Sequence, residues 1–143
     1  MTNRKFTPAT KVAEASRMRF LPAMFGTSYF LTGETSLFNS AYHYLPDYGG
    51  GMWEFYEAGA VRYAVPVARD RWRVCVPGNY FDGEMSADAA GIMLSLFALN
   101  AMAMFAHERH DDAATDFLSD AYHALRHHAC DHPEHRLILK AID

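Results

Sequence analysis

The sequence predicts an α+β domain, in which a small antiparallel meander of three strands packs against one long central helix and further surrounding helices. Three patterns predict it: apolar and polar residues alternate in short stretches between residues 52 and 76, residues 89–106 contain no charged side chain, and apolar residues recur at helical spacing over 111–129. With 143 residues, half of them hydrophobic, the chain has the size and apolar content of one domain, which excludes intrinsic disorder.

The first twenty residues are basic, with five basic side chains and one acidic one, whereas the remainder carries eight basic and sixteen acidic residues. No apolar stretch of the length that a signal peptide needs follows these charges. We therefore expect residues 1–18 to be a partly flexible arm, residues 19–143 to form a single domain, and the protein to be cytoplasmic. Cys75 and Cys130 are then expected to be free thiols.

The first helix expected in this domain begins at Thr32, whose hydroxyl can cap it, and ends before Pro46. Three strands are expected next, at residues 52–57, 60–65 and 72–76, with a hairpin turn at 58–59 and a charged loop at 69–71. Because such short connections join antiparallel neighbours, the three strands are expected to form one meander.

The uncharged segment 89–106 is at the lower edge of the length that spans a membrane. Three small or polar residues interrupt it: Gly91, Ser95 and Asn100. Ser86 can cap its start, and Asp88 suits the positive end of the helix dipole. We expect a buried core helix without membrane contact, in which Asn100 finds hydrogen-bond partners inside the core.

Two further helices are expected, one over residues 111–129 and a short one that Pro133 opens. Seven of the eight histidines lie between His107 and His135, and the pairs His123/His127 and His128/His132 are four residues apart. That spacing places each pair on one helix face, as in some metal sites. No HExxH motif and no evident third ligand accompany them, so no metal or other cofactor is expected.

Charge and motifs narrow the function classes. A net charge of −4 excludes a basic nucleic-acid-binding domain, and the chain lacks a nucleophile elbow, a P-loop and a dinucleotide-binding glycine motif. Asp112, Asp116 and Asp120 recur every four residues, a spacing that invites comparison with DNA phosphates. Three carboxylates are few against a duplex with one charge per about 1.7 Å, so a solvated helix face is the favoured interpretation.

The stretch VPGNYFDGEMSADAAGI at residues 76–92 resembles the ArdB/KlcA antirestriction family. Shorter matches support the resemblance: RFLP at 19–22, FG at 25–26, DY at 47–48, WEFY at 53–56, LFALN at 96–100 and AID at 141–143. The match covers the chain from about residue 19 to its end. It implies an α+β fold and a small cytoplasmic protein of a plasmid, phage or other mobile element. Such a protein shields incoming DNA from type I restriction–modification enzymes, and no catalytic residue follows from the resemblance.

The residues of this stretch can also be interpreted physically, as a partner-binding surface. Asn79, Tyr80, Asp82 and Glu84 are expected in a loop between the third strand and the long helix, where a partner can reach them, and Asp143 is a second exposed acidic candidate. Pro77-Gly78, a turn at Gly83 and the cap at Ser86 also suit a purely structural strand-to-helix corner.

The expected partner is the type I restriction–modification complex or an associated host factor, met by a monomer or weak homodimer without direct DNA binding. Two alternatives remain open: a DNA mimic that uses the acidic C-terminal half, and a metal-dependent enzyme built on the histidine-rich helix.

Overall fold

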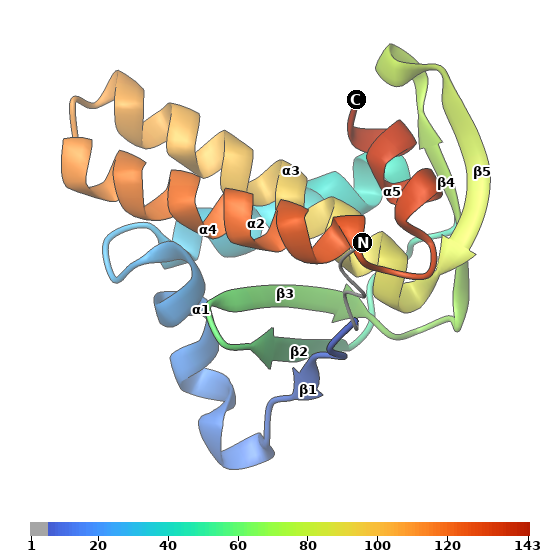
Figure 1. The fold of residues 1–143 in the computed structure, drawn as a ribbon, viewed down its shortest axis with the longest axis horizontal. Coiled ribbons are helices and arrows are strands. Elements are labelled where there is room, and N and C mark those ends of the chain that lie inside the picture. Colours follow the sequence, from blue (N-terminus) through green and yellow to red (C-terminus); the bar gives the residue numbers. More distant parts are fainter. Residues whose placement is uncertain (1–5) are drawn as a thin grey trace, which may run out of the picture.

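The computed structural model describes residues 6–143, so the first five residues of the expected arm lie outside the description. Within these residues, five α-helices and five strands make up an α+β fold, which confirms the predicted class (Figure 1). The elements, in chain order, are β1 (Thr10–Lys11), α1 (Arg17–Phe25), α2 (Phe30–Tyr44), β2 (Trp53–Ala58), β3 (Val61–Pro66), β4 (Arg71–Val76), β5 (Phe81–Ser86), α3 (Ala87–Glu108), α4 (Asp112–Cys130) and α5 (His135–Ile142), with short 3₁₀ turns at Glu14–Ser16 and Pro77–Asn79.

The strands form two separate antiparallel sheets rather than the single meander that the sequence predicts. The first sheet has the order β1-β2-β3, and the second is a two-stranded ribbon of β4 and β5. The expected third strand therefore exists, but it pairs with β5, from Arg71 opposite Ser86 to Val76 opposite Phe81. Residues 67–70 turn the chain away from β3, and the ribbon lies at the opposite end of the molecule from the α3–α4 connection (Figure 1).

The basic N-terminal segment contributes to the first sheet. Thr10 and Lys11 pair with Glu57 and Tyr56 of β2, and the next residue, Val12, is buried. Residues 10–12 thus extend the sheet within the range that the sequence assigns to the arm.

Helix α3 is the core of the molecule, as predicted. Among the described residues it alone is long and apolar enough to cross a membrane, and 67% of its most apolar window is buried. It packs against β3 and against α2, α4 and α5. Asn100 corrects one expectation, because its side chain is exposed and its amide contacts Met104 Sδ at 3.8 Å. The second half of α3 runs beyond both sheets with α4 alongside (Figure 1), which leaves one side open to solvent.

Two small residues let α3 lie directly on β3. A Cβ atom at Gly91 would come within 2.6 Å of the Ala64 carbonyl oxygen and of a Val65 methyl group. One turn further along, the buried Ser95 hydroxyl accepts a hydrogen bond of 3.0 Å from the Ala64 amide. Side chains of ordinary size at these positions would push the helix off the strand.

The helix boundaries follow the sequence prediction closely where a cap is present. Ser86 accepts a hydrogen bond from the Ala89 amide, which confirms it as the cap of α3, and Asp111 caps α4 through the Ala114 amide. Helix α2 lacks a side-chain cap and begins at Phe30, two residues before the predicted start. Helix α5 begins at His135 because the residues around Pro133 form a turn.

Candidate interaction surface

The predicted partner-binding residues lie in and around the turn of the β4–β5 ribbon. Strand β4 ends at Val76, the 3₁₀ turn Pro77–Asn79 follows, and Phe81 begins β5. Asp82 and Glu84 are therefore strand residues, which corrects the expectation that they lie in a loop. Gly83 is not a turn residue either, since it lies opposite Val74, and a Cβ atom there would come within 3.1 Å of the Phe81 ring.

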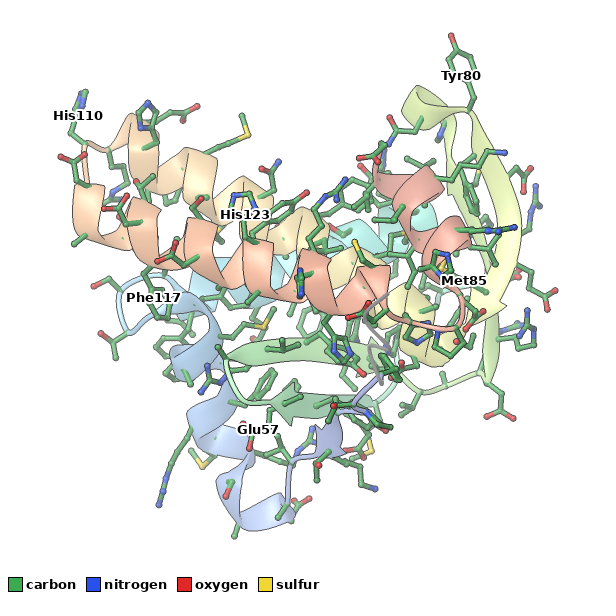
Figure 2. All side chains as sticks on the ribbon, in the orientation of Figure 1. Glu57, Tyr80, Met85, His110, Phe117 and His123 are labelled. Atoms are coloured by element: carbon green, nitrogen blue, oxygen red, sulfur yellow. The ribbon has the colours of Figure 1, made fainter. Side chains whose placement is uncertain are left out.

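Tyr80 is the most accessible of the predicted site residues. Its side chain is 95% exposed and points away from the body of the protein at the end of the ribbon (Figure 2). Its backbone adopts a left-handed conformation with φ of 54°, which is uncommon for a bulky residue, and its amide donates a hydrogen bond to the Pro77 carbonyl at 3.1 Å. The turn thus holds an aromatic ring in water at a conformational cost that core packing does not offset.

Asn79 does not face solvent freely, because its amide donates a hydrogen bond of 2.7 Å to the carbonyl oxygen of Ala141 in α5. This contact ties the ribbon turn to the end of the chain, and the C-terminus lies on the same side as the turn (Figure 1). Asp143 lies there with its carboxylate 3.3 Å from the Arg126 guanidinium. The structure therefore brings Asn79, Tyr80 and Asp143 toward one side of the molecule.

Asp82 and Glu84 form cross-strand ion pairs on the outer face of the ribbon. Asp82 accepts two hydrogen bonds from Arg73, at 3.0 and 3.2 Å, and these lower the pKa of its carboxyl group. Glu84 accepts one from Arg71 at 2.5 Å. Each acid is paired with an arginine, so this face presents alternating charges rather than an acidic patch.

The second half of the motif at 76–92 contributes to a polar network at the start of α3. Asp88 accepts hydrogen bonds from the Tyr63 hydroxyl at 2.7 Å and from His132 Nε2 at 2.8 Å. His132 Nδ1 accepts a hydrogen bond of 2.9 Å from the Glu134 amide, which leaves Nε2 to donate to Asp88. Burial raises the pKa of Asp88, but the hydrogen bonds from His132 and Tyr63 outweigh it and leave that pKa below its ordinary value.

The same network fixes the start of α3 to the turn before α5. The carboxylate of Glu134 accepts hydrogen bonds from both the amide and the hydroxyl of Ser86. Burial and the bond to Asp88 both raise the pKa of Tyr63, so its hydroxyl stays a donor. These contacts join three parts of the chain and give Ser86 and Asp88 a structural role.

The histidine pairs do not assemble a metal site. Within residues 6–143 no group of three or more histidine, cysteine, aspartate or glutamate side chains is arranged to hold an ion. His132 is engaged by Asp88, and His128 packs between the rings of Phe6 and Tyr63.

Comparisons with known proteins reveal the family. The family model of antirestriction proteins matches residues 46–143. The chain belongs to the antirestriction protein family. An Escherichia coli antirestriction protein KlcA is 44% identical over 138 residues, covering 94% of this chain and 92% of the relative. A putative antirestriction protein of E. coli K12, YubI, is 34% identical over 135 residues, covering 92% of this chain and 93% of the relative.

A solved antirestriction structure has the same fold, with a TM-score of 0.83 and 40% identity, and the match covers 99% of this chain and all of that one. It belongs to work on the KlcA and ArdB proteins that describes a novel fold and antirestriction activity against type I DNA restriction systems in vivo but not in vitro. The resemblance that the motif at 76–92 indicates is therefore confirmed.

Sequence reasoning missed several contacts of this antirestriction fold. The alternation of Phe81, Gly83 and Met85 with polar residues could have predicted β5. No sequence signal marks the bond from Asn79 to Ala141 or the pairing of Asp88 with His132, because the partners are 62 and 44 residues apart.

Proposed function

We propose that this protein protects incoming DNA from type I restriction–modification enzymes through contacts with protein, without catalysis. We further propose that it acts in the cytoplasm of a cell that has received a mobile element. Membership of the antirestriction family supports the first statement, and the resemblance of the motif at 76–92 supports the second.

The observation that carries the proposal is the exposed ring of Tyr80. Tyrosine is enriched among the residues that dominate protein–protein binding, because it offers a large contact area and one polar group at a low entropic cost. Here the ring is 95% exposed on a turn that is tied to α5 through Asn79. We infer that Tyr80 is the anchor of a protein contact and that Asp143, on the same side, lies at its edge.

Direct DNA mimicry is the weaker alternative for two reasons. The carboxylates of Asp82 and Glu84 are paired with arginines, so the ribbon lacks the continuous negative charge of a duplex. The related KlcA and ArdB proteins are described as active in vivo but not in vitro, whereas a DNA mimic would inhibit a purified enzyme. A host factor that associates with the restriction machinery fits this difference better as the partner.

The test is the plating efficiency of unmodified phage on cells with a type I system, with and without this gene. We expect the gene to raise plating, and to change nothing for phage that already carries the protective modification or in cells without the system. Equal plating at confirmed expression would contradict the proposed function.

A further inference from the structure

A groove follows one flank of α4 over most of its length. It consists of three hollows of about 330, 150 and 480 Å³, and consecutive hollows share a lining residue, first Phe117 and then Ala124. Its opposite wall changes along the way, from the 26–29 loop to α1 and the β2–β3 turn, and finally to residues 6–10. We name it the α4 groove; the α4 residues that matter here are Ala114, Phe117, Asp120, Ala121 and Ala124.

The floor of the α4 groove is apolar and made of small side chains. Ala121 and Ala124 of α4 face Ala23 of α1 and Ala60 of the β2–β3 turn. Phe117, 45% exposed, forms one edge of the groove, on the flank of α4 that faces the 26–29 loop (Figure 2). Because alanines leave room above them, a segment of another molecule can approach the backbone of α4 closely.

The formal charges on α4 before Arg126 are all negative. From Asp112 to Leu125 the helix carries three aspartates and no lysine or arginine. Asp120 lies in the groove itself, and Asp111 lines its first hollow, where hydrogen bonds from Tyr29 and the Ala114 amide lower the pKa of its carboxyl group. Arg62 is the one lysine or arginine among the described lining residues, and it lies 3.9 Å from Glu57.

A buried polar atom without a partner lies at the other end of the groove. His128 lines the third hollow, is 9% exposed, and its Nε2 has no hydrogen-bond partner in the described structure. Buried ring nitrogens are normally paired, so this histidine is an unexplained polar group in the wall of the groove.

We propose that the α4 groove docks a basic amphipathic segment of a protein partner, with apolar side chains over Ala121 and Ala124 and lysine or arginine side chains against Asp120 and the aspartates that precede it. An apolar concave surface with acidic walls concentrates cations and fits such a segment, whereas it repels nucleic acid. The inference that this partner belongs to the restriction pathway rests on the proposed function. The inference that the groove binds a basic amphipathic segment does not.

The first experiment uses purified protein and two synthetic peptides of about 15 residues. In one, leucines occupy one face of a helix and lysines the opposite face; the other has glutamate in place of lysine. Titration followed by backbone amide NMR should shift the signals of Ala114, Ala121 and Ala124 with the lysine peptide alone. Asp120→Lys should weaken this binding about tenfold, since it reverses a charge inside the groove. Asp47→Lys, an equal charge change at an exposed residue after α2, should leave it unchanged.

Three results would overturn the proposal: equal shifts with the glutamate peptide, shifts that fall outside the α4 groove, or equal weakening by both charge reversals. The second experiment is phage plating, in which Asp120→Lys should lower protection about tenfold and Asp47→Lys should not. If wild type itself gives no protection, the proposed function is wrong, whereas the peptide titration still tests whether the groove binds a basic segment. If wild type and Asp120→Lys protect equally, the groove has no part in antirestriction.

Discussion

The two sheets of this protein are held in place by different means. In the three-stranded sheet, β3 lies under α3 with Gly91 and Ser95 at contact distance, and Tyr63 reaches the network around Asp88. The β4–β5 ribbon buries one face, while its outer face carries exposed ion pairs and its turn exposes Tyr80. The motif at 76–92 runs from the ribbon into α3, so Ser86, Asp88 and Gly91 serve the fold, whereas Tyr80 reaches solvent.

The largest loss of stability is expected from Gly91→Ala. The new methyl group would meet backbone and side-chain atoms of β3 at 2.6 Å, and the strand cannot move because β2 pairs with it. We expect urea unfolding to show a loss of about 2–3 kcal/mol. Gly78→Ala is the matched control, since a Cβ atom there meets nothing within 4 Å. Equal stabilities of the two variants would remove the contrast between the two regions.

A smaller loss of stability is expected from Asp88→Asn. This substitution puts an amide in place of the carboxylate that accepts the hydrogen bond from His132 Nε2. We expect about 1–2 kcal/mol at neutral pH, since Asp88 is partly exposed. The pKa of Asp88 is lower in the folded chain than the ordinary 3.8, so its stabilisation is present above about pH 4 and disappears as the pH falls through the folded value. The variant should therefore lose less stability than wild type between pH 5 and 2.

Unfolding measurements across that pH range check this expectation. Glu84→Gln, on the exposed outer face of the ribbon, is the control and should follow the wild-type curve. If the unfolding free energies of wild type and Asp88→Asn fall in parallel as the pH is lowered, the network contributes nothing to the attachment of α3.

His128→Phe should act in the opposite direction. The ring nitrogen without a partner disappears, and we expect a gain of about 1 kcal/mol at pH 7. Burial lowers the pKa of His128, helped by the neighbouring His132 and opposed by Asp88 and Asp131, so the unfolded chain takes up the proton first as the pH falls below 6.5. Wild type should lose stability from pH 7 to 5 more steeply than the variant. A variant that is less stable at every pH would show that the imidazole is satisfied.

The sequence predicted the elements whose determinants are local. The cap at Ser86, the uncharged run of α3 and the helical spacing of apolar residues in α4 are all local signals, so the positions of these two helices could be predicted. The pairing of β4 was missed because it depends on β5, whose polar residues face outward and whose glycine suggests a turn. The exposure of Asn100 was missed because composition does not reveal that α3 extends past the sheets.

The candidate surface was predictable only in part. A motif shows which residues accompany one another, and it led to Asn79, Tyr80, Asp82 and Glu84 without separating their roles. The different roles of these four residues depend on contacts with α5 and on the cross-strand arginines, which no local spacing encodes. The shared groove along α4 likewise depends on alanines from three distant segments.

The most direct test of the central claim is phage plating with Tyr80→Gly. Glycine accepts the positive φ at this position, so removal of the ring should cost no stability and should leave the thermal midpoint at or above that of wild type. Tyr42→Ala, which removes a tyrosine that is 61% exposed on α2, is the control. We predict that Tyr80→Gly lowers protection against a type I system at least about tenfold while Tyr42→Ala protects like wild type. Full protection by folded Tyr80→Gly would contradict the claim that the ribbon turn is the antirestriction contact.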